Sequence, residues 1–142
     1  MELDLSWIVG NVVERVQYDA QTRRWFFAIS DQTMLAVDCS WKIILPRTVP
    51  LASGDHGQQY GLTSPIDAAG KAMELLARHK IRSIASDKLT SDLTINFEDD
   101  IILRTFNASS GFEAWQLTGP QGVEFIAQGN GNIVTLSAQK RS

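Results

Sequence analysis

The chain has 142 residues, a formal net charge of −3 at pH 7 and a single cysteine, Cys39. This length suits one domain with its own core, so we expect a single domain over residues 1–142. The mild acidic excess argues against a nucleic-acid-binding protein, and the lone cysteine excludes an internal disulfide.

The N-terminal residues MELDLSW carry acidic side chains where a secretory signal peptide needs basic ones. No apolar run approaches the roughly 18 residues that a membrane-spanning helix requires. We therefore expect a cytoplasmic protein whose mature chain starts at residue 1 and which has no membrane partner.

Strands dominate the first third of the chain. Residues 11–18, 23–30, 33–38 and 41–45 are predicted strands separated by short polar turns. In the second of them Trp25, Phe27 and Ile29 share one face, which is the period-two pattern of a half-buried strand. Pro46 ends the fourth strand because proline has no N–H for the ladder. Residues 46–63 are then predicted to form a long loop.

One main helix is predicted, over residues 65–80. Ser64 is expected to be its N-cap, Pro65 its first helical residue and Asp67 the acidic partner in a capping box. Apolar residues recur at three- and four-residue spacing and predict one buried stripe. This stripe contains Ile66, Ala69, Met73, Leu76 and Ala77.

The pattern of the first half recurs after the helix. A shift of 68 positions places turns on turns and apolar residues on apolar residues: Trp25, Phe27 and Leu35 fall on Leu93, Ile95 and Leu103. A further six positions place Trp41 on Trp115. Either residues 11–50 and 79–138 are repeat halves linked by the loop 46–63 and the helix 65–80, or two β-meanders simply look alike. Both readings stay open.

The chain closes with a predicted hairpin of residues 123–128 and 133–138. Asn130-Gly131 at its tip favours a type I′ turn, which needs positive φ at both residues. Together the elements predict an α+β fold, with about eight or nine antiparallel strands packed around the one helix.

Asp55 and His56 are the pair that most resembles acid/base or metal chemistry. They lie in the long loop between Gly54 and Gly57, and the neighbouring sequence offers no third metal ligand and no nucleophile. We therefore predict that the protein is not an enzyme and has no catalytic residues, metal or cofactor. An enzyme that uses this loop is the less favoured alternative.

Glu98, Asp99 and Asp100 form a predicted acidic turn. This turn is either a solvated connection between strands or an anionic patch for a basic partner.

The strand that begins near Glu113 is expected to bring this carboxylate onto the same face as Trp115. Because a buried carboxylate needs hydrogen bonds, Glu113 is predicted to accept them from the backbone of residues 109–111. Glu113, Trp115 and Trp41 are therefore predicted to be structural residues.

The stretch GFEAWQL at residues 111–117 is followed by a Pro/Gly turn, an apolar strand and a glycine-rich tip. This order resembles a family of small uncharacterised bacterial domains with a G-[FY]-E-x-W motif, which are often proposed as immunity proteins of polymorphic toxin systems. The resemblance implies no active site. It implies a protein-binding function in which the chain neutralises a cognate toxin, such as a nuclease domain, by direct binding.

An acidic surface on such an inhibitor would steer association with a basic groove. On this reading the partner-facing surface contains Glu98, Asp99, Asp100, Asp55, His56, Gln58, Gln59 and Tyr60. The alternative is a homodimer formed by an apolar sheet face, such as the one that carries Phe26 and Ala28.

Overall fold

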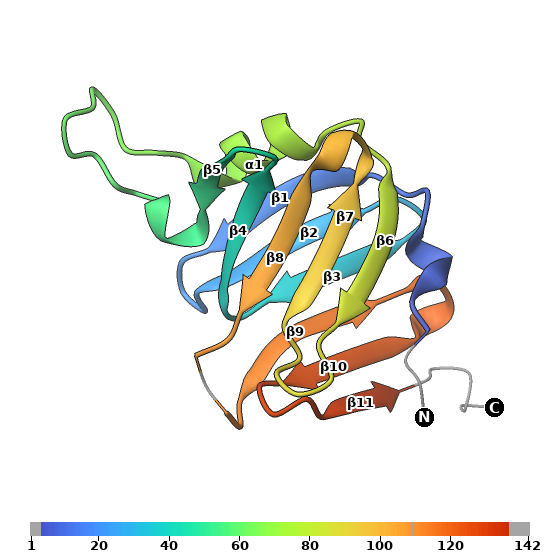
Figure 1. Cartoon of the computed structure of the whole chain (residues 1–142). Coiled ribbons are helices and arrows are strands. Elements are labelled where there is room, and N and C mark those ends of the chain that lie inside the picture. Colours follow the sequence, from blue (N-terminus) through green and yellow to red (C-terminus); the bar gives the residue numbers. More distant parts are fainter. Residues whose placement is uncertain (1–3, 109, 137–142) are drawn as a thin grey trace.

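The computed structural model describes residues 4–108 and 110–136 (Figure 1). In these residues the chain forms eleven strands, one α-helix and four short 3-10 turns. The strands are β1 (Val13–Asp19), β2 (Arg24–Ile29), β3 (Thr33–Val37), β4 (Ser40–Leu45), β5 (Thr48–Ala52), β6 (Ile81–Ser86), β7 (Leu93–Phe97), β8 (Ile102–Phe106), β9 (Glu113–Thr118), β10 (Glu124–Gln128) and β11 (Ile133–Leu136). The helix is α1 (Ala68–Leu76), and the turns are η1 (Ser6–Ile8), η2 (Ser53–Asp55), η3 (Glu98–Asp100) and η4 (Pro120–Gly122).

The strands form two antiparallel sheets, with orders β1-β2-β3-β9-β10-β11 and β5-β4-β8-β7-β6. The sheets face each other and their strands cross steeply (Figure 1). Rings from both sheets meet in the core, where Trp41 of the second sheet lies 5.0 Å from Trp25 and 5.5 Å from Phe27. The prediction that the sheet packs around the helix is therefore wrong, because the sheets pack on each other and α1 covers one end. The protein is mainly β, and α+β describes it only coarsely.

The strand count of eleven exceeds the predicted eight or nine, and one of the additional strands lies in the expected loop 46–63. Residues 48–52 form β5, which pairs with β4 in the register Ile43 to Leu51. Pro50 lies in β5, and β5 is an edge strand of its sheet. Proline is tolerated at such an edge because its missing N–H faces no neighbouring strand.

The helix is shorter than predicted and starts later. Asp67 is the N-cap, and its Oδ1 accepts from the Gly70 N–H at 3.1 Å. Ile66 cannot be helical because its backbone pairs with Gly57 and Gln58. The buried stripe is accordingly Ala68, Ala72 and Leu76.

The two halves have the same strand topology. In each half three strands form a meander, β1-β2-β3 or β6-β7-β8, and the next strand leaves to join the other sheet. β4 pairs with β8, and β9 pairs with β3. The two meanders are thereby tied together by exchange of their fourth strands. A common origin of the halves stays a prediction.

The registers of the halves agree residue by residue at the shift of 68 positions. The Phe27–Leu35 pair of β2 and β3 corresponds to the Ile95–Leu103 pair of β7 and β8. Both edge strands shift register at equivalent places, between residues 13 and 15 and between residues 81 and 83. The same turn residues are left-handed in each half, with Arg23, Asp31 and Gln32 matching Ser91, Asp99 and Asp100.

The final hairpin of β10 and β11 forms as predicted over residues 124–136, and residues 137 and 138 lie outside the described part of the chain. Its tip is not a type I′ turn, because only Gly131 of the Asn130-Gly131 pair has positive φ, at 86°. Gly131 instead permits close approach to the turn after β6. A Cβ built at Gly131 would overlap the backbone oxygen of Lys88.

Candidate functional site

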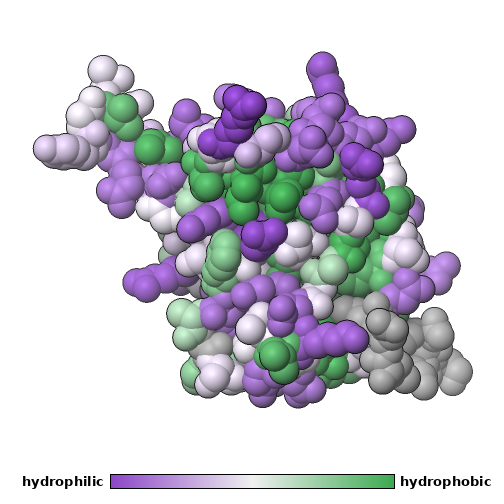
Figure 2. Space-filling model, viewed as in Figure 1, coloured by the Kyte–Doolittle hydropathy of each residue, from purple (hydrophilic) through white to green (hydrophobic). Residues whose placement is uncertain are grey.

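Residues 57–66 form a projection, which we call the finger, between η2 and α1. It stands out from the body of the molecule, and hydrophobic residues are exposed along it (Figures 1 and 2). Two backbone hydrogen bonds close its base, from Gly57 N to Ile66 O at 2.9 Å and from Ile66 N to Gln58 O at 2.8 Å. The finger is therefore a loop whose base is closed by backbone hydrogen bonds, and residues 57–66 contain no strand.

The tip of the finger is a tight turn of residues 59–62. Leu62 N donates to Gln59 O at 2.8 Å, and Gly61 has a φ of 74°. Positive φ at the third turn position is the place where glycine is favoured. The turn presents Tyr60, which is 99% exposed, and Leu62, which is 50% exposed. Three of the predicted partner-facing residues, Gln58, Gln59 and Tyr60, lie in this projection.

Asp55 and His56 do not form an acid/base pair. Asp55 Oδ2 accepts from Ala52 N at 3.0 Å, and His56 Nδ1 accepts from Ala68 N at 3.1 Å. Each side chain thus satisfies a backbone N–H next to a helical turn, which is a structural task. In the ranges 4–108 and 110–136, no group of three His, Cys, Asp or Glu residues could hold a metal ion.

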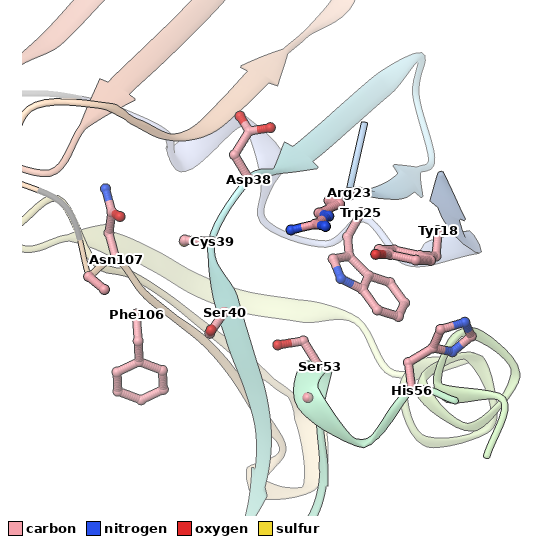
Figure 3. A pocket seen from close by; sticks show the side chains of 12 residues that line it. Tyr18, Arg23, Trp25, Asp38, Cys39, Ser40, Ser53, His56, Phe106 and Asn107 are labelled. Carbon is pink, nitrogen blue, oxygen red and sulfur yellow. The ribbon is translucent and has the colours of Figure 1, made fainter. Parts of the chain in front are cut away.

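The base of the finger borders an open pocket of about 570 Å³. Its walls come from the β1–β2 turn, the start of β4, η2 and the end of β8, and Figure 3 labels ten of the lining residues. The rings of Tyr18, Trp25 and His56 form a cluster with centroid distances of 4.5 to 5.4 Å. Sequence reasoning named His56 but missed Tyr18 and Trp25 as pocket residues, because the walls come from distant segments.

Of the charged residues that line this pocket, Asp38 has an ion-pair partner and Arg23 has none among the described residues. Arg24 Nε donates to Asp38 Oδ1 at 2.6 Å, so the one carboxylate of the lining is already neutralised. Arg23 also lines the pocket and is exposed, and no acidic side chain of the described residues pairs with it. Arg23 is therefore the one lining residue whose charge is not paired within the described part of the chain.

Cys39 lines the same pocket but is not an activated nucleophile. Burial raises the pKa of the Cys39 thiol to about 11, against an opposing hydrogen bond with Thr105. The carboxylates of Asp92 and Asp38 add to the rise. The thiolate is the reactive form, so this cysteine stays a thiol at neutral pH.

We expect Cys39 to react with iodoacetamide at about pH 8 roughly a hundredfold more slowly in the folded protein than in the urea-unfolded chain. The reason is the rise of its pKa from 9.0 to about 11. Because the folded thiol holds its proton more tightly, its contribution to stability is complete below pH 9 and is lost as the pH rises through 11. Equal alkylation rates in the folded and unfolded chain would contradict this assignment.

The acidic turn is η3, at the same end of the molecule as the finger and α1 (Figure 1). Two of its three carboxylates contact neighbouring residues 79 and 80. Glu98 Oε1 accepts from Lys80 N at 2.8 Å, and Asp99 Oδ2 lies 2.9 Å from His79 Nδ1. Asp100 is exposed. The prediction that η3 contacts a partner stays a prediction, and Asp99 and Asp100 are its most exposed members.

The prediction that Glu113 shares a buried face with Trp115 is wrong. The register of β9 against β10 shifts between these residues: Trp115 is opposite Ala127, Glu113 is opposite Gln128, and Ala114 has no counterpart. The extra residue turns Glu113 out to solvent while Ala114 and Trp115 stay buried. Glu113 therefore needs no partner from residues 109–111, and residue 109 lies outside the described part of the chain.

Trp115 and Trp41 are both fully buried, as expected for structural residues. Their indole groups differ in one respect. Trp115 Nε1 donates to Ser91 O at 2.7 Å, whereas Trp41 Nε1 is buried and has no hydrogen-bond partner among the described residues.

The alternative homodimer surface is the outer face of the six-stranded sheet. Phe26 and Ala28 are half-buried there, beside Ala36 and Met34 in the cross-strand register. The homodimer stays a prediction. None of the helices in residues 4–108 and 110–136 is long and apolar enough to span a membrane.

No protein-family model, curated protein or solved structure matches this chain.

Proposed function

We propose that this protein is a protein-binding module that uses the finger to occupy a concave site of its partner. In keeping with the family resemblance of residues 111–117, we propose that it is an immunity protein acting in the cytoplasm and that the partner is a toxin domain. The observation that carries the proposal is the geometry of the finger, a loop closed at its base that holds Tyr60 away from the rest of the fold.

A projection of this kind loses little conformational entropy on binding. The hydrogen bonds at its base and in the 59–62 turn are already present in the free chain. Preorganisation raises affinity because fewer degrees of freedom are lost on association. Tyrosine adds a large contact area at the cost of only two side-chain torsions.

The exposure of Tyr60 supports a binding role over a packing role. At 99% exposure this ring contributes almost nothing to the core. Tyrosine is among the residue types enriched at binding hot spots, which lie in desolvated pockets of the partner. Insertion of a projecting loop into a cavity is how long recognition loops engage concave targets.

The acidic surface near the finger suits a basic partner. The chain has a net charge of −3, and Asp99 and Asp100 are exposed at the end of the molecule from which the finger projects. An acidic patch accelerates association with a positively charged groove, such as the substrate groove of a nuclease.

The test is the affinity for a purified toxin domain encoded beside this protein, measured by isothermal titration calorimetry. We expect a dissociation constant below about 1 μM for the unaltered chain and a loss of about 30-fold or more for Tyr60→Ala. Leu89→Ala is the matched control, because Leu89 is 81% exposed but lies in the β6–β7 connection at the other end of the molecule (Figure 1). Its affinity should be unchanged.

Two results would count against the proposal. The finger is not the binding element if Tyr60→Ala binds as tightly as the unaltered chain. The toxin-binding function itself fails if the unaltered chain shows no saturable binding and does not protect cells that express the toxin.

Replacing Asp100 with asparagine should slow association and weaken its salt dependence if the acidic turn steers the encounter.

A further inference from the structure

Because the two halves agree in register, each turn of one half can be compared with the equivalent turn of the other half. Arg23 follows the β1–β2 turn and corresponds to Ser91 after the β6–β7 turn, with φ values of 61° and 63°. In both turns the backbone N–H of this residue donates to the backbone oxygen of the aspartate four positions earlier, Asp19 or Asp87. The two turns therefore have the same backbone frame.

The surroundings of these two turns differ. In the second half, Ser91 is fully buried and its carbonyl oxygen accepts from Trp115 Nε1 at 2.7 Å. In the first half, Arg23 is exposed and the equivalent indole, Trp41, has a buried N–H without a partner among the described residues. We call the second half closed at this turn because the indole N–H bonds to the turn, and the first half open because the equivalent indole N–H does not.

The pocket of about 570 Å³ lies at the open turn. Three residues of its wall, Tyr18, Arg23 and Trp25, stand at the positions of Ser86, Ser91 and Leu93 in the closed half. Small or aliphatic residues are thus replaced by two aromatic rings and a guanidinium group. Its volume falls within the range of about 300 to 1,000 Å³ that is typical of small-molecule sites.

Three side chains that line this pocket can donate a hydrogen bond. The ring of His56 accepts from Ala68 N through Nδ1, so its proton is on Nε2. The hydroxyl of Ser53 accepts from Trp41 N at 3.0 Å and keeps its own proton available. The phenol of Tyr18 packs against the His56 ring and offers a further O–H (Figure 3).

The only carboxylate of the lining does not balance Arg23. Asp38 is held by Arg24 at 2.6 Å, and Figure 3 shows its carboxylate directed away from Tyr18 and His56. A guanidinium group that no acidic side chain pairs, with neutral donors beside it, is a set that recognises carboxylate or phosphate oxygens.

We propose that this pocket binds a small molecule through a carboxylate or phosphate group. Arg23 supplies the charge, while Tyr18 and His56 donate hydrogen bonds and cover the adjoining part of the ligand with their rings. The site is separate from the tip of the finger and does not depend on binding of a protein partner. Carboxylate and phosphate ligands share this chemistry, and the test distinguishes them.

The test is an NMR titration of the isotope-labelled chain with inorganic phosphate in one arm and benzoate in the other. We expect saturable shifts of the Tyr18, Arg23 and His56 amides with at least one of the two anions. Saturation with phosphate alone assigns the site to phosphate compounds, and saturation with benzoate assigns it to carboxylates.

Arg23→Asn removes the charge while keeping a residue that tolerates positive φ, so the turn should still form. We expect it to weaken the anion about tenfold, because a charge-assisted hydrogen bond is lost. Arg82→Gln is the matched control: it removes the same charge from an exposed position of β6, the edge strand at the other side of the second sheet. Tyr18→Phe removes only the hydroxyl and should weaken binding several-fold.

The proposal is overturned if neither anion gives saturable shifts below about 10 mM. It is equally overturned if Arg82→Gln weakens the anion as much as Arg23→Asn, because the effect would then reflect net charge alone. Both outcomes are independent of the affinity for a toxin, so this site and the finger can fail separately.

Discussion

Replacing Gly131 with alanine is expected to lower the free energy of unfolding by about 3 kcal/mol or more. Two effects add at this position. Gly131 has a φ of 86°, a conformation that alanine adopts only with strain. A Cβ would also overlap the backbone oxygen of Lys88 and lie 3.0 Å from that of Leu89. Backbone atoms cannot rotate aside as a flexible side chain can, so the hairpin of β10 and β11 must move off the turn.

Urea unfolding of three variants separates these effects. Gly131→Asn keeps the overlap but reduces the conformational strain, because asparagine tolerates left-handed φ better than alanine does. We expect it to be nearly as unstable as Gly131→Ala if the overlap dominates. Gly54→Ala is the control, since a Cβ there meets nothing within 4 Å and Gly54 does not have positive φ. A Gly131→Ala variant as stable as Gly54→Ala would show that the hairpin tip does not pack on residues 88 and 89.

The strands of each half could be predicted from local patterns. Trp25, Phe27 and Ile29 alternate with less buried residues, and burial follows this alternation in β2. The partner of each fourth strand could not be predicted in this way. β4 joins β8 and β9 joins β3 through contacts between residues far apart in sequence, which periodicity does not encode.

The start of the helix shows how two local signals compete. Ser64 followed by Pro65 is a typical start of a helix, and Asp67 would then be its capping-box partner. The base of the finger decides otherwise, because Ile66 is held in an extended pair with Gly57 and Gln58. Asp67 then becomes the cap itself. A tertiary contact thus overrides a sequence signal that was locally consistent.

The candidate sites differ in how far the sequence predicts them. The long polar loop predicts that Tyr60 faces a partner, and in the structure Tyr60 lies at an exposed tip. The pocket was not predicted, since its walls come from four separate segments. One signal was available. Arg23 occupies the position that Ser91 occupies in the other half, and arginine is an unusual residue at a turn position with positive φ.

The two tryptophans provide the second large effect. Trp115→Phe is expected to lower the free energy of unfolding by about 3 kcal/mol, and Trp41→Phe by only about 1 kcal/mol. Both residues are fully buried and occupy equivalent positions in the two halves, so each substitution removes the same volume. Trp115→Phe also leaves the carbonyl oxygen of Ser91 without its indole donor. Trp41→Phe, in contrast, removes a buried N–H that has no partner among the described residues.

The difference between these variants reports mainly on the hydrogen bond, because each substitution removes the same side-chain volume from a fully buried position. We expect about 2 kcal/mol between them in urea unfolding, which is the size of a buried donor or acceptor left unsatisfied. Equal losses for both variants would mean that Trp41 Nε1 is satisfied in solution, for instance by a buried water. Adding the anion that fills the pocket should stabilise the unaltered chain and Trp115→Phe equally, because Trp115 lies outside the pocket. A smaller ligand-induced gain for Trp41→Phe would show that this indole supports the pocket wall at Trp25, whose ring it meets edge-on at 5.0 Å.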